Sequence, residues 1–126
     1  MNQAPEHSLS GLPGTNFAGH CAGGTYPGSN LLSECQTIKE AITYCQDRNV
    51  KILLSIGGVY NTGASNYKVT TDENGRDFAD ILYKAFGPHN EYSGLVRPFD
   101  SVGEDGNAIY NAVDGFDFDI EHDLRE

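Results

Sequence analysis

The stretch DGFDFDIE, from Asp114 to Glu121, places four acidic residues among two phenylalanines and an isoleucine. Successive side chains on a β-strand point to opposite faces. One face of such a strand carries Phe116, Phe118 and Ile120. The other face carries Asp117, Asp119 and Glu121. The alternation predicts a strand over Val113 to Glu121, with its apolar face under a covering helix and its acidic face against a polar space.

The acidic face of this predicted strand has a spacing that suits catalysis. Neighbours two residues apart on one face lie roughly 6–7 Å from each other. Carboxylates in such a row resist full ionisation, and a protonated carboxylic acid beside a carboxylate is what cleavage of a glycosidic bond requires. Asp114 has the opposite parity and is expected to stay out of this row.

The acidic strand has two other interpretations. An acidic face is also typical of the solvated side of an edge strand, and alternation alone favours that explanation. A calcium-binding loop requires glycine at its sixth position, where this chain has His122 if the count starts at Asp117. The interleaved apolar residues also favour a strand over a loop.

The sequence around this strand predicts an α/β fold. The apolar run from Lys51 to Ile56, ended by Gly57 and Gly58, indicates a strand buried on both faces, as in a parallel sheet. A helix over Asn30 to Asn49, capped by Ser29 or Asn30, would present one apolar face: Leu31, Cys35, Ile38, Ile42 and Cys45. A second helix over Gly75 to Phe86 would end at Gly87-Pro88 and bury Phe78, Leu82 and Ala85. Helix, strand, helix, strand is the order of repeated βα units.

The connecting segments are long. Residues 1–29 are predicted to be loop, with Asn16–Ala18 as the one short extended piece, and Val59 to Asn74 is also predicted to be loop. Residues 89–111 form a third long loop, whereas connections in compact αβ units usually take about 2–6 residues.

Composition restricts the function. The chain has 126 residues, enough for one modest domain, and a net charge of −10. Such a chain repels phosphate and anionic lipid, so we expect no nucleic-acid partner and no membrane association. The first residues lack the features of a signal peptide. The three cysteines form no C-x-x-C pair, so no metal site is expected, and one disulfide with one leftover thiol is compatible with their number.

Two motifs together resemble glycoside hydrolase family 18. These are Ser55-Ile56-Gly57-Gly58, which fits an SxGG pattern, and DGFDFDIE, which fits DxxDxDxE. Three further stretches resemble the class III, plant- and fungal-type chitinase branch: NFAGHC (Asn16–Cys21), KILLSIGG (Lys51–Gly58) and RPF (Arg97–Phe99). The resemblance covers nearly the whole chain. It implies a partial (β/α)8 TIM barrel in which residues 1–126 are a single, incomplete catalytic domain holding the third and fourth strands.

The resemblance also implies a reaction and a set of residue roles. Family 18 chitinases cleave β-1,4-linked N-acetylglucosamine polymers with retention, using the substrate's own acetamido group as the nucleophile. Carried over, Glu121 is the general acid, Asp119 orients the acetamido group, and Asp117 shares a proton with Asp119. Asp114 and Gly115 belong to the structural part of the motif. Ser55, Gly57 and Gly58 would shape the barrel floor beside the acids and bind substrate there, although a tight strand exit explains these three nearly as well.

The remaining implications concern partners and location. In this branch, positions matching Cys21 and Cys35 form a disulfide, and the partner of Cys45 would lie upstream of residue 1. A disulfide framework implies secretion, hence an extracellular or cell-wall location. The expected partner is chitin or a chitooligosaccharide, the expected action is endo, the full-length protein is expected to be a monomer, and no cofactor is expected.

The chain departs from the family in length. A (β/α)8 barrel takes about 250 residues, so two strands would precede Met1 and four would follow. The family's later tyrosine and tryptophan positions have no counterpart, and the chain has no tryptophan. Residues Ser101 to Asn111 look inserted. We therefore expect a piece of a chitinase or a truncated product, marginally stable, aggregation-prone and inactive on chitin by itself.

Three alternatives to a chitinase remain open. A chitin-binding, chitinase-like lectin typically lacks the final acid, which is present here as Glu121. An enzyme acting on N-glycan cores carries similar acids, and the third alternative is an inactive remnant. His20 and His122 are expected to be loop or packing residues. The loop tyrosines could reach the sugar, but ordinary surface tyrosines explain them as well: Tyr60, Tyr67 and Tyr92.

Overall fold

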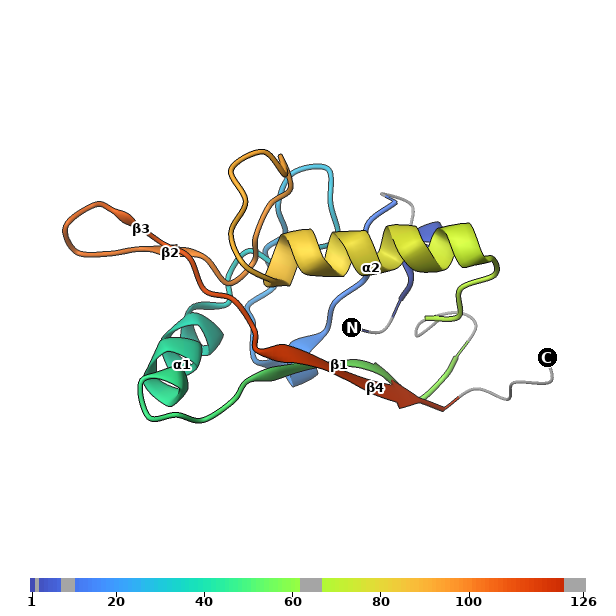
Figure 1. Cartoon of the computed structure of the whole chain (residues 1–126), viewed down its shortest axis with the longest axis horizontal. Coiled ribbons are helices and arrows are strands. Elements are labelled where there is room, and N and C mark those ends of the chain that lie inside the picture. The colour runs from blue at the N-terminus through green and yellow to red at the C-terminus, as the bar shows by residue number, and fades with distance from the viewer. Residues whose placement is uncertain (2, 8–10, 62–66, 122–126) are drawn as a thin grey trace.

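The protein is a small α/β unit built around two parallel strands and two helices (Figure 1). A computed structural model describes residues 1, 3–7, 11–61 and 67–121. The helices are α1 (Gln36–Gln46) and α2 (Asp72–Phe86), and the strands are β1 (Leu53–Gly58), β2 (Ser101–Val102), β3 (Ala108–Ile109) and β4 (Gly115–Ile120). The predicted α/β class, with two main helices and a parallel strand pair, is confirmed.

The two predicted motifs lie side by side on β1 and β4. These strands pair in parallel, and the register matches Ser55 with Asp117 and Gly57 with Asp119. The backbone of Met1 occupies the other edge of β1, where its amino group donates to the Ser55 carbonyl at 2.7 Å and its carbonyl accepts from the Gly57 N–H at 2.7 Å. Because parallel strands end on the same side of a sheet, the SIGG segment and the acidic residues reach one edge together.

Helix α2 follows the predicted pattern but begins three residues earlier than expected. Thr71 caps it, since its side-chain oxygen accepts the N–H of Asn74 at 3.1 Å. Asp72 and Glu73 then place negative charge in the first turn, where the helix dipole favours it. The helix ends at Phe86 as predicted, and its buried residues are Phe78, Leu82, Ala85 and Phe86.

Helix α1 begins six residues later than the sequence suggests, so the predicted start and its caps are wrong. Ser29 stabilises a loop instead: its hydroxyl accepts from the Leu31 N–H at 3.1 Å, and Leu32 pairs with Thr25 in an isolated antiparallel bridge. Cys35 occupies the position before the helix without a side-chain cap. Leu31 is fully buried as expected, but it reaches the core from this loop.

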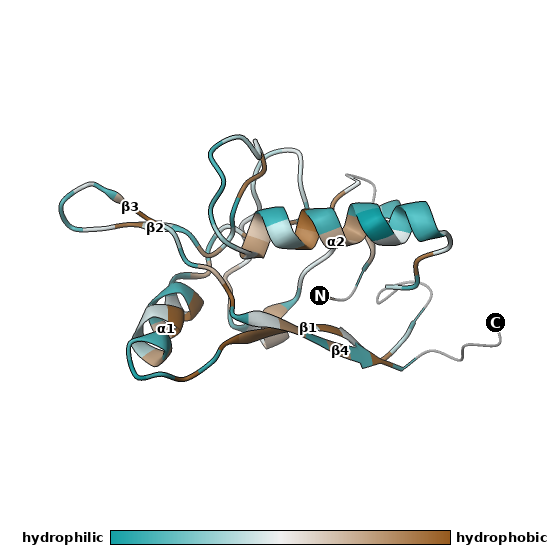
Figure 2. Ribbon diagram, viewed as in Figure 1, coloured by the Kyte–Doolittle hydropathy of each residue, from teal (hydrophilic) through white to brown (hydrophobic). Residues whose placement is uncertain are grey.

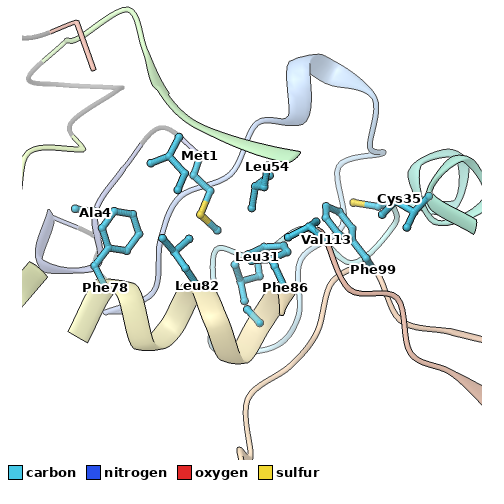
Figure 3. Packing of buried hydrophobic residues seen from close by; sticks show 13 residues of the cluster. Met1, Ala4, Leu31, Cys35, Leu54, Phe78, Leu82, Phe86, Phe99 and Val113 are labelled. Carbon is cyan, nitrogen blue, oxygen red and sulfur yellow. The ribbon is translucent and has the colours of Figure 1, made fainter. Parts of the chain in front are cut away.

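The core lies between α2 and the strand pair (Figure 3). The side chain of Met1 lies between Leu54 of β1 and the helix residues Phe78 and Leu82. At the other end of α2, three aromatic rings pack together, with centroid distances of 5.1 to 6.3 Å: Phe17, Phe86 and Phe99. Residues of the N-terminal segment therefore fill the space that separates the helix from the strands.

Burial of the strands is less complete than predicted. Leu54 and Ile56 of β1 are buried, but Leu53 is 57% exposed, so β1 is not buried on both faces. On β4, Phe116 packs against the core, whereas Phe118 is 66% and Ile120 45% exposed. The described residues supply no helix over the second half of β4, and the hydropathy colouring shows apolar residues near the end of the strand pair (Figure 2). The predicted covering of this apolar face is thus wrong beyond Phe116.

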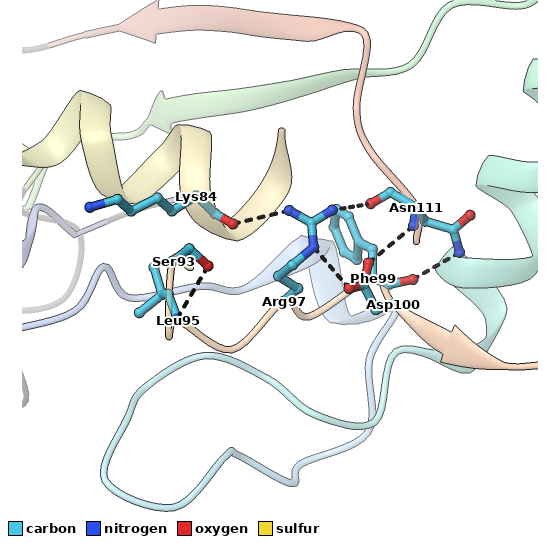
Figure 4. Close-up of polar contacts among 7 residues, drawn as sticks. All are labelled: Lys84, Ser93, Leu95, Arg97, Phe99, Asp100 and Asn111. Atoms are coloured by element: carbon cyan, nitrogen blue, oxygen red, sulfur yellow. Dashed lines mark hydrogen bonds and ion pairs between the residues drawn. The ribbon is translucent and has the colours of Figure 1, made fainter. Parts of the chain in front are cut away.

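The long connection before β4 is more ordered than a loop. Strands β2 and β3 form an antiparallel hairpin within residues 89–111, and the hairpin projects away from the strand pair (Figure 1). The buried Arg97 ties the base of this connection together, donating to Asp100 Oδ2 at 2.8 Å, the Lys84 carbonyl at 3.0 Å and the Asn111 carbonyl at 3.2 Å (Figure 4). Asn111 donates in turn to the Phe99 carbonyl at 2.9 Å. The RPF segment therefore joins the end of α2 to the residues that lead into β4.

Near the N-terminus, the described part of residues 1–29 contains two short 3-10 turns, Pro5–His7 and Phe17–Gly19. The second turn replaces the predicted extended piece. The Asn16 side chain accepts the Gly19 N–H at 3.2 Å, which favours the turn over an extended backbone. Among the described residues, neither helix combines the length and the apolar character that crossing a membrane requires.

Candidate active site

The candidate site lies where β1 and β4 end, on the face of the strand pair that carries the acids. Ser55 and Asp117 are register partners, and the Ser55 hydroxyl donates to Asp117 Oδ2 at 2.9 Å. Both side chains are exposed, as are Asp119 and Glu121. The ion pairs in the described chain involve other acids, namely Asp80, Asp100 and Asp114. The acidic face is therefore open to solvent and joined to β1 by the hydrogen bond from Ser55.

Gly57 allows the two strands to approach closely at the site. Its φ is +119°, in the region that favours glycine, and a Cβ atom on it would lie 1.9 Å from the Asp119 carbonyl oxygen. Gly58 also has a positive φ, +87°, but a Cβ there would have no neighbour within 4 Å. The two glycines thus differ. Position 57 requires glycine because a side chain would clash with β4, whereas position 58 favours glycine only because of its positive φ.

Asp119 and the SIGG segment border one hollow of about 440 Å³. The hollow is lined by Met1, Asn16, Phe17, Ala18, Leu54, Ser55, Gly57, Gly58, Val59 and Asp119. It therefore brings the start of NFAGHC beside the motif residues of both strands. Asp117 lies outside the lining but is bonded to Ser55, which lies inside it.

Tyr67 is a site residue that the sequence pattern missed. Its side chain is 4% exposed, and its hydroxyl donates to the Gly58 carbonyl at 3.0 Å and accepts the backbone N–H of Glu121. The ring of Tyr60 packs edge-on against it, with a centroid distance of 5.5 Å. The sequence predicts only a loop tyrosine at position 67, because neither periodicity nor motif spacing connects it to a strand end 54 residues away. By contrast, Tyr92 is 87% exposed and His20 is exposed, while His122 lies outside the described residues.

Asp114 anchors the start of β4 from outside the acidic row. Its carboxylate accepts the Ile52 N–H at 2.9 Å, the Gln46 side-chain amide at 3.0 Å and the Lys51 ammonium at 3.2 Å. These bonds, led by the Ile52 backbone N–H, lower the pKa of Asp114 from 3.8 to about 2. The next residue, Gly115, pairs with Leu53, and a Cβ on it would lie 3.0 Å from the Leu53 side chain. This part of the motif joins β4 to α1 and to the residues before β1.

The disulfide between Cys21 and Cys35 is present, as the family resemblance implied. It connects the end of NFAGHC, whose first residues border the hollow, to the residue that precedes α1. Cys45 is a free, half-buried thiol. Within the described ranges, no three side chains of histidine, cysteine, aspartate or glutamate converge as metal ligands would.

Comparison with known proteins relates this arrangement to chitinases. No family model matches the chain. It is 40% identical over 126 residues to the "Probable endochitinase" of Arthroderma benhamiae and 40% identical over 129 residues to "Endochitinase A" of Aspergillus niger. These matches cover 96% and 97% of this chain. "Chitinase 3" of Candida albicans is 42% identical over 108 residues, or 85% of the chain.

The chain spans only a small part of these relatives: 16%, 9% and 16% of their respective lengths. The similarity nevertheless includes almost every residue of this chain, so it is not confined to one short motif. The predicted resemblance to chitinases is confirmed: this chain is similar to fungal endochitinases over the segment of their sequence that it spans.

Proposed function

We propose that this chain carries the acidic catalytic strand of a chitinase of glycoside hydrolase family 18, in the class III branch. In this proposal residues 1–126 are part of one catalytic domain, and β1 and β4 are the third and fourth strands of a (β/α)8 barrel. The observation that supports it best is the register of β1 and β4, which bonds Ser55 to Asp117 and faces Gly57 with Asp119. The 40% identity to fungal endochitinases supports it independently.

The proposed reaction uses the substrate as its own nucleophile. Glu121 donates a proton to the glycosidic oxygen while the acetamido oxygen of the sugar attacks the anomeric carbon and the C–O bond to the leaving sugar breaks. The product of this step is an oxazolinium ion. Glu121, now ionised, takes a proton from water as that water attacks the anomeric carbon, so the configuration is retained.

Asp119 and Asp117 receive supporting roles in this proposal. Asp119, which borders the hollow, accepts the acetamido N–H and stabilises the positive charge of the oxazolinium ion. Asp117 shares a proton with Asp119, and the Ser55 hydroxyl orients its carboxylate at 2.9 Å. Ser55, Gly57 and Gly58 line the same hollow as Asp119, which supports a role for these three residues in binding the sugar.

The same proposal predicts that the 126-residue chain has no turnover by itself. All three acids are exposed, whereas electrostatic catalysis needs a site from which water is largely excluded. The remaining parts of the proposal are endo action on chitin or chitooligosaccharides, a monomeric full-length protein, and an extracellular or cell-wall location.

The test is a chimera in which this chain replaces the matching segment of the Arthroderma benhamiae relative. The two sequences align over 126 residues. We expect the chimera to hydrolyse chitooligosaccharides and Glu121→Gln to lower kcat by roughly 10²–10⁴-fold. Glu73→Gln, the same change at an exposed position in the first turn of α2, serves as the matched control. Full activity of the Glu121→Gln chimera, or turnover by the isolated chain, would contradict the proposal.

A chimera that binds chitin but does not cleave it would favour the lectin alternative. Glu121 is the observation against that outcome, because the proposed general acid is present at the end of the motif. Cleavage of N-glycan cores in preference to chitooligosaccharides would favour the alternative of an enzyme that acts on N-glycan cores.

A further inference from the structure

We propose that Tyr67 is a positioning residue that holds the proposed general acid Glu121 in place through its main chain. The inference rests on the proposed function of Glu121 and adds a residue outside the two sequence motifs. The supporting observation is that the buried Tyr67 hydroxyl forms hydrogen bonds both to the end of β1 and to the residue after β4.

The ladder between β1 and β4 ends just before the acid. Its last register pair is Gly58 with Ile120, and Glu121 is the next residue. The Tyr67 hydroxyl donates to the Gly58 carbonyl at 3.0 Å and accepts the Glu121 N–H. Tyr67 therefore extends the strand pairing by one residue, using a side chain where a strand partner is not available.

A tyrosine hydroxyl suits this position because it can donate one hydrogen bond and accept another at the same time. The Tyr67 side chain is only 4% exposed, so water competes weakly for either bond. The Tyr60 ring packs against it at 78°, which restricts the phenol further. The hydroxyl is thus held by packing before it binds the strand ends.

The effect on Glu121 is indirect. Its carboxyl group is exposed, and Tyr67 bonds to its backbone N–H. Fixing that N–H fixes the direction in which the side chain leaves the strand, and small errors in the placement of a catalytic group lower the rate strongly. The Tyr67 hydroxyl bonds to backbone groups of Gly58 and Glu121, so we expect it to position the acid without contacting the substrate or transferring a proton.

Amide hydrogen exchange on the 15N-labelled 126-residue chain tests the bond directly. In the wild type we expect the Glu121 amide to exchange at least about tenfold more slowly than in an unstructured peptide. Tyr67→Phe keeps the ring and removes the hydroxyl, and we expect exchange of this amide to accelerate on the order of tenfold. Tyr92→Phe, the same change at a tyrosine that is 87% exposed, should leave the Glu121 exchange rate unchanged.

The wild-type measurement keeps the proposal falsifiable even if Tyr67→Phe does not fold. A Glu121 amide that exchanges as fast in the wild-type chain as in an unstructured peptide overturns the proposal. So does a Tyr67→Phe chain that folds and keeps the wild-type exchange rate at Glu121.

Kinetics in the chimera described above test whether the bond matters for the reaction. We expect Tyr67→Phe to lower kcat on the order of tenfold with little change in KM, and to alter the limb of the pH–rate profile that reports the acid. An unchanged kcat and pH profile would overturn the positioning role. A parent chimera without turnover would instead contradict the proposed function, while hydrogen exchange would still decide whether Tyr67 holds Glu121.

Discussion

At the residue scale, Gly57 shows most directly how the two strands depend on each other. A Cβ atom at this position would lie 1.9 Å from the backbone oxygen of Asp119, and a backbone atom cannot move aside as a flexible side chain can. Gly58 has a similar positive φ but open space around it. Comparing an alanine substitution at Gly57 with one at Gly58 therefore separates the free-energy cost of a steric clash from that of an unfavourable backbone conformation.

We predict that Gly57→Ala lowers the free energy of unfolding by roughly 2–4 kcal/mol, because the strand pair must move apart at Asp119. Gly58→Ala should cost about 1–2 kcal/mol, from its φ of +87° alone. Urea unfolding of both variants beside the wild-type chain measures the difference. Equal losses would mean that β1 and β4 do not approach as closely at Gly57 as described.

Individual residues also show where sequence patterns succeed. Alternation on β4 assigned Asp117 to the face opposite Phe116, and its bond to Ser55 and the core packing of Phe116 agree with that parity. Tyr67 could not be found in this way. Its position depends on how the chain returns from β1 toward α2, and no periodic signal records where a loop residue comes to lie.

At the scale of elements, the helices were predicted unequally well. The apolar residues of α2 recur with helical spacing and are buried on one face. The start of α2 was readable in principle, since Thr71 followed by Asp72 and Glu73 is a typical helix start. Before α1, Leu31 and Cys35 have helical spacing, but the bridge from Thr25 to Leu32 and the disulfide at Cys35 give this stretch another structure. Such long-range constraints are invisible to periodicity.

Asp114 connects three elements, so its protonation should weaken the fold. Its pKa is lowered to about 2 in the folded chain, chiefly by the Ile52 backbone N–H and then by Gln46 and Lys51. A lowered folded-state pKa means that the ionised form stabilises the folded chain above about pH 4 and that this contribution disappears as the pH falls toward about 2. We predict that Asp114→Asn is less stable than wild type at neutral pH and that the difference shrinks across this window.

Urea unfolding midpoints measured from about pH 6 to about pH 2 provide the test. Lys51→Ala serves as the comparison, because it removes the partner whose side chain is 79% exposed and leaves the bonds from Ile52 and Gln46 intact. It should retain most of the wild-type pH dependence. A constant gap between wild type and Asp114→Asn at all pH values would contradict the assignment of the lowered pKa to these bonds.

At the scale of the whole molecule, the sequence predicted which residues share a face but not which faces are covered. Parity placed Phe116, Phe118 and Ile120 together correctly, yet only the first packs against the core. Whether an apolar face is covered depends on how many helices and strands surround it, and an alternating pattern does not predict that number. In the described part of the chain one helix and the N-terminal segment pack over the strand pair, so apolar side chains at the end of β4 remain exposed.

These exposed side chains predict how the 126-residue chain behaves in solution. Phe118 is 66% and Ile120 45% exposed, on a strand whose outer edge has no partner within the described residues. Exposed apolar residues on an unpaired edge promote association between chains. We predict that the double change Phe118→Thr and Ile120→Thr slows aggregation, measured by light scattering at equal concentration, while changing the free energy of unfolding by less than about 1 kcal/mol.

Phe116→Thr is the matched control on the same strand. Phe116 is half-buried against the core, so its loss should lower the free energy of unfolding by about 1–3 kcal/mol and, by populating unfolded chains, increase aggregation. Threonine is well tolerated in strands, so both changes test apolar contact with little effect on strand propensity. If the double variant aggregates as fast as the wild type, the end of β4 is not the surface that drives association, and the exposed Leu53 on the opposite face of the strand pair becomes the next position to change.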